Sequence, residues 1–166
     1  MYALVTGASS GIGLQYATVL AEKYKKDLVL VSNQEKELEE AAKDIAEKYG
    51  VKTIALYKDL STETAPQEVY DFCKENNIEV EILINNAGVF YFNDLCKTSE
   101  ARINLMLHLH IRTVTQMCRL FGMDMRERGK GYILNMSSMS AWMTMPGIQC
   151  YNASKSYILN FSRSMW

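Results

Sequence analysis

The feature that most constrains the fold of this 166-residue chain is a glycine-rich turn placed directly after a short apolar run near the N-terminus. Residues 2–6 have the composition of a buried strand, and residues 7–13 carry glycines in the spacing G-x-x-x-G-x-G before a helical pattern begins. A glycine cluster at the junction of a first strand and a first helix is typical of nucleotide-binding α/β folds. The turn therefore predicts a strand, a backbone cradle and a helix, in that order.

Each glycine of the turn has a separate predicted task. Gly7 is expected to make the tight turn, Gly11 to let the backbone approach a pyrophosphate, and Gly13 to let the helix pack on the sheet. Hydroxyl groups close by supply extra hydrogen-bond donors: Thr6, Ser9 and Ser10. The alternative is a turn that merely needs glycines for its backbone, and the position of the cluster together with the hydroxyls favours the nucleotide site.

The rest of the chain alternates short β-rich runs with helical patterns, which is typical of βαβ units around a parallel sheet. Strands are predicted at residues 2–6, 27–32, 52–57, 81–85 and 131–136. Helices are predicted at residues 12–24, 35–49, 65–76, 99–128 and 151–166. Right-handed crossovers then give one α/β domain over residues 1–166, a doubly wound parallel sheet of the Rossmann type with strand order 3-2-1-4-5.

Composition argues against several functional classes. Eighteen basic and nineteen acidic residues leave a net charge of −1, so no basic surface is expected to hold nucleic acid. No apolar stretch is long enough to span a bilayer, and the chain enters a strand without a signal-type segment, which predicts no membrane partner and a cytoplasmic location. The cysteines are far apart, and His108 and His110 would point in different directions on a helix. We therefore expect buried, reduced thiols and no metal site.

The end of the second predicted strand bears on the choice between NAD and NADP. An acidic side chain there would bind the ribose hydroxyls of NAD, whereas a basic one would accept the phosphate of NADP. This chain has Ser32, Asn33 and Gln34, which favours NADP and keeps NAD as the alternative. The nearest cation in the sequence is Lys36. Asp59, after the third strand, is a candidate acceptor for an adenine amino group or, alternatively, a surface cap of the following turn.

A candidate reactive pair stands at the start of the last predicted helix. Tyr151 and Lys155 are four residues apart, so both side chains emerge on one face. A lysine ammonium beside a phenol stabilises the phenolate, which would make Tyr151 a general acid and base, with Lys155 as its partner and a donor to the cofactor ribose. Ser138, just beyond the fifth strand, could hydrogen-bond a substrate carbonyl as charge develops on its oxygen. Alone, a Tyr-x-x-x-Lys spacing often arises by chance, and its combination with the glycine turn gives it weight.

Taken together, these motifs resemble those of the short-chain dehydrogenase/reductase family. Residues 6–13 are similar to the cofactor turn of that family, and residues 59–61 are similar to its acidic motif on the adenine side. Residues 85–88 are similar to the segment that steadies its central sheet. The catalytic triad of the family corresponds to a further set: Ser138, Tyr151 and Lys155.

The resemblance implies reversible hydride transfer between a nicotinamide cofactor, NADP or NAD, and a small-molecule carbonyl or alcohol substrate. Tyr151 would protonate the carbonyl oxygen during reduction. The cofactor-binding residues that the resemblance implies are Gly7, Ser9, Ser10, Gly11, Ile12, Gly13, Asn33, Asp59, Leu60, Asn86, Ala87, Gly88, Tyr151 and Lys155. It also implies a homo-oligomer, a dimer or tetramer, assembled through the two helices at residues 99–128 and from residue 151 onward.

One residue departs from the family pattern inside the predicted fourth helix. Where the family commonly has a catalytic asparagine, this chain has His110. A histidine could hold the water that relays protons to Lys155, or it could be a partly buried helix residue without that role. Asn104 is the other candidate for the asparagine, and it lies almost two helical turns away.

Length is the second departure. Family members usually have about 250 residues, and the segment that follows the catalytic tyrosine is short here, so the last two strands of the family would be missing. The fifth strand would then be an exposed edge, and a nucleotide-binding or oligomeric remnant without catalysis is the alternative function. The methionines at positions 136, 139, 143 and 145, with Trp142, suggest either an apolar substrate wall or, as we prefer, core or subunit interface.

Overall fold

The computed structural model describes residues 1–165, in which five parallel strands form one sheet in the order β3-β2-β1-β4-β5. The strands are β1 (Tyr2–Thr6), β2 (Asp27–Ser32), β3 (Thr53–Tyr57), β4 (Val80–Asn85) and β5 (Tyr132–Asn135). The predicted fold class and strand order are confirmed, and every strand boundary agrees with the prediction to within one residue. In this order β1 lies at the centre of the sheet, between β2 and β4.

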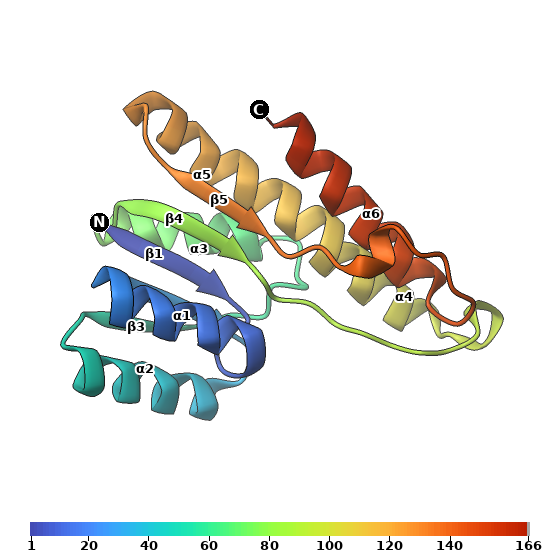
Figure 1. Ribbon diagram of the computed structural model, residues 1–166, viewed down its shortest axis with the longest axis horizontal. Helices are drawn as coiled ribbons and strands as arrows, with labels where there is room; N and C mark the ends of the chain where they lie inside the picture. Colours follow the sequence, from blue (N-terminus) through green and yellow to red (C-terminus); the bar gives the residue numbers. More distant parts are fainter. Residues whose placement is uncertain (166) are drawn as a thin grey trace.

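Helices cover the sheet on both faces (Figure 1). They are α1 (Gly11–Tyr24), α2 (Glu35–Tyr49), α3 (Ala65–Glu75), α4 (Glu100–Leu107), α5 (Val114–Arg128) and α6 (Gln149–Ser164). The alternation along β1 produces the two cores: Ala3 and Val5 pack with residues of α1 and α2, whereas Leu4 packs with residues of α3 and α5. A third, smaller cluster, centred on Cys118 and Ile158, joins α6 to α5.

The helix predicted over residues 99–128 is interrupted, which corrects that expectation. It consists of α4, a π-helical turn at His108–Thr113, and α5. A π turn holds one more residue than an α-helical turn, and hydrophobic periodicity over a long window does not detect a single added residue. Tertiary hydrogen bonds stabilise the turn, because the Thr113 hydroxyl donates to the Leu60 carbonyl at 2.6 Å and His110 is bonded at both ring nitrogens.

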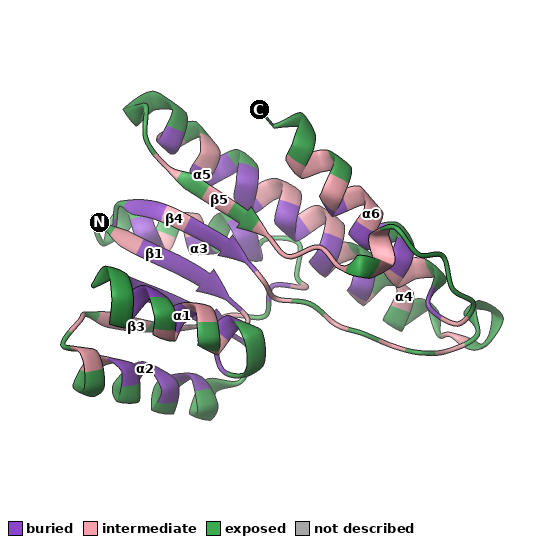
Figure 2. Cartoon of the chain, in the orientation of Figure 1, coloured by how far each residue is buried: buried purple, intermediate pink, exposed green. Residues whose placement is uncertain are grey.

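Strand β5 is one of the two edge strands of the sheet. It pairs with β4 only, and Tyr132 keeps 65% of its surface exposed, so within residues 1–165 it is the exposed edge that the sequence predicts. Figure 2 shows the contrast between the buried β1 and β4 and the partly exposed β5. The expectation of buried thiols holds for Cys73 and Cys118, whereas Cys150 is partly buried. It is wrong for Cys96, which is exposed in a short 3-10 helix, Leu95–Lys97.

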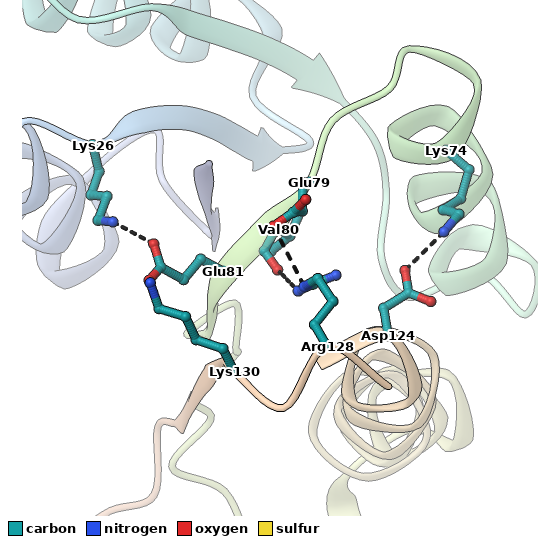
Figure 3. A network of polar contacts seen from close by, with 8 residues as sticks. All are labelled: Lys26, Lys74, Glu79, Val80, Glu81, Asp124, Arg128 and Lys130. Atoms are coloured by element: carbon teal, nitrogen blue, oxygen red, sulfur yellow. Dashed lines mark hydrogen bonds and ion pairs between the residues drawn. The ribbon is translucent and has the colours of Figure 1, made fainter. Parts of the chain in front are cut away.

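Charged residues tie the strands together at the end of the sheet away from the glycine turn (Figure 3). The buried carboxylate of Glu81, in β4, pairs with Lys130 at 2.7 Å and also with Lys26. Hydrogen bonds from Lys130 and Lys26 lower the pKa of Glu81 to about 2. Because Lys26 precedes β2 and Lys130 precedes β5, this cluster, which we call the ionic clip, links the two halves of the sheet.

Candidate active site

The glycine turn has the backbone conformation that its residues predict. Gly7 and Gly11 adopt positive φ angles of +66° and +56°, which side chains disfavour. Gly13 lets α1 approach the residues that directly follow β1 and β4, because a Cβ there would lie 2.1 Å from the Gly7 carbonyl oxygen and 2.6 Å from the Asn86 side-chain nitrogen. The turn therefore has no room for even one added methyl group at this position.

Residues that follow β4 form hydrogen bonds with the start of the glycine turn. The Asn86 side-chain amide donates to the carbonyl oxygens of Thr6 at 3.0 Å and Gly7 at 3.3 Å. The Thr6 hydroxyl accepts from the backbone N–H groups of Asn86 and Ala87 and donates to the Ile84 carbonyl. The expectation that Thr6 is an extra donor for a ligand is therefore wrong, because its hydroxyl is buried and already donates within the fold.

A cleft of about 360 Å³ opens beside this turn at the carboxyl ends of β1, β2, β3 and β4. It is lined by ten of the predicted cofactor-binding residues, namely Gly7, Ser9, Ser10, Ile12, Asn33, Asp59, Leu60, Asn86, Ala87 and Gly88. Gly11 and Gly13 shape the turn without lining the cleft, and Tyr151 and Lys155 lie on α6 beyond it. The topology thus brings residues from four separate segments to one edge of the sheet.

The cleft also contains a cation that the sequence analysis missed. Lys58 lines it, whereas the exposed Lys36 is not among its lining residues. The Lys58 backbone N–H donates to the Ser32 carbonyl at 2.9 Å, and its ammonium pairs with Glu68 at 2.7 Å. The strand order was a usable signal, because neighbouring parallel strands β2 and β3 bring the residues that follow them together.

Two polar groups of the cleft are already engaged within the fold. The buried Ser9 hydroxyl donates to the Gln34 side-chain oxygen at 2.7 Å and lies 2.9 Å from the Ser32 hydroxyl. One carboxylate oxygen of Asp59 accepts from the backbone N–H and the hydroxyl of Ser61. Asp59 is therefore both the cap of this turn and a residue of the cleft wall.

Helix α6 presents Tyr151 and Lys155 on one face, as predicted. The Lys155 side chain is buried, and its Nζ donates to the Met136 carbonyl at 2.7 Å, at the end of β5. The same nitrogen lies 5.6 Å from the centre of the Tyr151 ring. Burial lowers the pKa of Lys155 to about 8, so the amine keeps a proton at neutral pH but releases it more readily than an exposed lysine does.

Ser138 stands in a segment that runs alongside α6. The Ser137 hydroxyl donates to the Lys155 carbonyl and the Ser156 hydroxyl to the Ala141 carbonyl, each at 2.9 Å. The Ser138 hydroxyl oxygen accepts from the Ser140 N–H at 3.1 Å and, among the bonds formed within residues 1–165, it donates none. No hydrogen bond joins Ser138 to Tyr151 in that part of the chain.

His110 is buried, with 1% of its surface exposed. Its Nε2 accepts from the backbone N–H of Val89 at 3.0 Å, and its Nδ1 lies 2.9 Å from the Ser154 hydroxyl. Burial and, second, the charge of Lys155 lower the pKa of His110 to about 3. With both nitrogens engaged, this geometry favours the structural interpretation of His110 over the one in which it holds a water.

Exposed apolar side chains gather in two segments, residues 90–92 after β4 and residues 139–145 after β5, and we call them the apolar rim. Its members are Phe90, Phe92, Met139, Trp142, Met143 and Met145. The two segments lie together, because the Phe92 ring contacts Gly147, and Phe90 packs edge-on against the Tyr151 ring at 5.0 Å. Met139, Trp142, Met143 and Met145 are 47–81% exposed, so they do not belong to the core, and a place in a subunit interface stays a prediction.

A cleft at the carboxyl edge of a doubly wound sheet, beside a glycine turn and a Tyr-Lys pair, defines a dinucleotide-binding α/β fold. The family model described as short chain dehydrogenase matches residues 1–166. The chain therefore belongs to the short-chain dehydrogenase family.

Individual relatives agree with this assignment. The chain is 35% identical over 174 residues to a very-long-chain 3-oxoacyl-CoA reductase of Anas platyrhynchos, covering 99% of this chain and 53% of the relative. It is 35% identical over 171 residues to the inactive hydroxysteroid dehydrogenase-like protein 1 of Homo sapiens, covering 99% and 50%. The chain thus spans about half the length of the relatives it matches.

Solved structures share the fold. A short-chain dehydrogenase from Sphingobium yanoikuyae in complex with NADPH matches with a TM-score of 0.92 at 29% identity, covering 99% of this chain and 63% of that one. The bulky-bulky ketone specific alcohol dehydrogenase from Comamonas testosteroni matches with a TM-score of 0.92 at 28% identity, covering 99% and 65%. No helix within residues 1–165 combines the length and apolar character needed to cross a membrane.

Proposed function

We propose that this chain carries the nucleotide site and the proton-transfer residues of an NAD(P)-dependent oxidoreductase acting on a small carbonyl or alcohol. The observation that supports it most is the buried Lys155 amine, 5.6 Å from the Tyr151 ring, on a helix next to the cleft beside the glycine turn. A solvated helix face, the ordinary reason for a Tyr-x-x-x-Lys spacing, would leave the lysine exposed. Burial of this amine is therefore what separates a reactive pair from a chance one.

The residues of the cleft fit a dinucleotide. The positive φ angles of Gly7 and Gly11 open the turn, and Gly13 leaves no side chain between the turn and α1. Backbone N–H groups at the start of α1 would bind the pyrophosphate, with Ser10 and Ile12 beside it. Asn33 would face the ribose, and Asp59 and Leu60 the adenine.

We favour NADP over NAD for this cleft. The residues that line it at the end of β2 are Ser32, Asn33 and Gln34, which would not repel a phosphate. Lys58, next to Ser32, carries a positive charge that would attract a phosphate, which would share the ammonium with Glu68. The NADPH complex of the Sphingobium yanoikuyae relative supports the same choice.

The bound nicotinamide would supply or accept the hydride. Tyr151 would give its phenol proton to the carbonyl oxygen during reduction and take it back during oxidation. The Lys155 ammonium would stabilise the phenolate formed in that step, and the free O–H of Ser138 would bind the carbonyl oxygen. The apolar rim favours a substrate with an apolar body. Assembly into a dimer or tetramer stays a prediction.

A second candidate is nucleotide binding without turnover. Its support is that the chain spans about half the length of its relatives, and that one of them, in Homo sapiens, is named as inactive. Under this alternative the cleft still binds NADPH, and Tyr151 has no substrate to protonate.

Fluorescence titration with NADPH and NADH, followed by a panel of carbonyl substrates, separates the two candidates. We expect saturable NADPH binding, and turnover that falls by about 10²- to 10⁴-fold in Tyr151→Phe because the general acid is lost. Binding of NADPH by this variant should stay within about twofold of the unchanged chain, since the hydroxyl is not needed to hold the pyrophosphate. Turnover that survives the substitution would refute the general-acid role proposed for Tyr151, and binding without any turnover in the unchanged chain would select the second candidate.

A further inference from the structure

A single buried side chain connects the cleft wall to the helix that carries the reactive pair. Val89 lines the cleft, and its backbone N–H donates to Nε2 of His110. On the other side of the same ring, Nδ1 lies 2.9 Å from the hydroxyl of Ser154, in α6 between Tyr151 and Lys155. The imidazole of His110 thus spans the space between β4 and α6.

The hydrogen-bond partners determine which ring nitrogen carries the proton. The Ser154 hydroxyl has one hydrogen, and it donates that hydrogen to the Tyr151 carbonyl at 2.8 Å. Ser154 therefore accepts from His110, so Nδ1 carries a hydrogen. Because Nε2 accepts from Val89, it carries none. The ring is held as the neutral Nδ1–H tautomer.

The surroundings oppose any other state of this ring. A second proton on Nε2 would point at the N–H group of Val89, and two hydrogen-bond donors that face each other repel. Two titratable groups face the ring from α6: the Lys155 ammonium, which disfavours a second positive charge, and Tyr151, whose ring lies 5.7 Å away edge-on. Gly88 leaves the space that the ring needs, since a Cβ at that position would lie 2.9 Å from Nε2.

We propose that His110 is a positioning residue that sets the place of Tyr151 relative to the nucleotide cleft by bridging Val89 and Ser154 as a permanently neutral Nδ1–H ring, and that it takes no part in proton transfer. An imidazole suits this task because its acceptor and its donor lie on opposite sides of one rigid ring. The effect on catalysis rests on the proposed function, whereas the tautomer and the bridge do not.

Nitrogen NMR of histidine-labelled protein tests the tautomer without any assay of activity. The chain has two histidines, so His108→Gln leaves His110 as the only labelled ring. We expect the Nδ1–H tautomer with no titration from about pH 5 to about pH 9, far from the ordinary midpoint of about 6.5. A ring that titrates in this range, or that carries its proton on Nε2, would overturn the proposal even if the protein were inactive.

Amide hydrogen exchange tests the bridge. His110→Phe keeps a buried ring but removes the acceptor, so exchange at the Val89 amide should rise by about tenfold or more. Thr113→Val is the matched control, because it removes a buried hydrogen bond of the same π turn to Leu60 and leaves the bond to Val89 intact. Equal exchange at Val89 in the His110 variant and the unchanged chain would contradict the bridge.

Where turnover is measurable, the pH profile separates positioning from proton relay. Ser154→Ala leaves Nδ1–H without its acceptor, and we expect kcat to fall by about threefold to thirtyfold while the pH dependence of kcat keeps its shape. His110→Asn should lower kcat in the same way and also leave the shape of the profile unchanged. A change of shape in either variant would indicate that the ring moves protons.

Discussion

The nucleotide cleft and the apolar rim lie at the same edge of the sheet, yet they are built differently. Around the cleft, the side chains of Thr6, Ser9 and Asn86 are hydrogen-bonded within the fold, so the turn holds its shape without a ligand. In the apolar rim, Met139 and Phe92 keep 81% and 70% of their surface exposed. Residues 1–165 therefore combine a preorganised cleft with an exposed apolar rim. Under the proposed function, cofactor binding would depend on backbone geometry, whereas substrate choice would depend on the exposed side chains of the rim.

The largest expected effect comes from breaking the preorganised cleft at Gly13. In Gly13→Val, the added side chain would overlap the Gly7 carbonyl and the Asn86 amide, so the turn cannot keep its shape. We expect loss of measurable NADPH binding and a stability loss of about 3 kcal/mol or more. Gly122→Ala is the control, since its nearest neighbour would be 3.7 Å away. Tight NADPH binding by the Gly13 variant would show that the cleft is not preorganised in the way we describe.

A smaller effect is expected at the ionic clip, which joins the two halves far from either site (Figure 3). The pKa of Glu81 is lowered to about 2 in the folded state, from an ordinary value of 4.5. A lowered pKa means that the carboxylate stabilises the fold above about pH 4.5 and that this contribution is lost as the pH falls toward about 2. Glu81→Gln should lower the free energy of unfolding at pH 7 by on the order of 2 kcal/mol.

Urea unfolding at a series of pH values measures the effect of the clip. The Glu81→Gln variant should lose less stability than the unchanged chain between about pH 4.5 and about pH 2. Glu47→Gln is the matched control, because its exposed pair with Lys43 at 3.9 Å should contribute less than about 0.5 kcal/mol. Parallel pH curves for the Glu81 variant and the unchanged chain would rule out the clip as a source of acid sensitivity.

The smallest expected effect is a change in cofactor affinity at Lys58, which tests how the cleft recognises a phosphate. Lys58→Gln removes the cation that lines it, so we expect the Kd for NADPH to rise by about tenfold while the Kd for NADH stays nearly constant. Lys36→Gln, an exposed lysine outside the cleft, should change neither value by more than about twofold. An equal weakening of both cofactors would mean that Lys58 acts through the structure of the cleft and not on the phosphate.

Much of the fold follows from local sequence signals. Apolar runs and turn residues located all five strands to within one residue, because buried parallel strands are short and strongly apolar. The glycine turn and the pair Tyr151 and Lys155 depend on spacing alone, which the sequence displays directly.

The remaining features depend on contacts between distant segments. The bonds of His110 to Val89 and Ser154 and the place of Lys58 beside Ser32 require the sheet order before they can be inferred. The exposure of Met139 and its neighbours could not be predicted either, since an apolar composition does not say which surface covers it.

The π turn at His108–Thr113 sets how far α4 is rotated about the helix axis relative to α5. One additional residue rotates everything before it by about 100° relative to a continuous α-helix. Deleting a single residue from this turn would swing α4 around its own axis and turn the imidazole away from its neighbours, while leaving α5 seated on the sheet. The length of this turn is therefore needed together with the imidazole of His110 to keep the segment after β4 joined to α6.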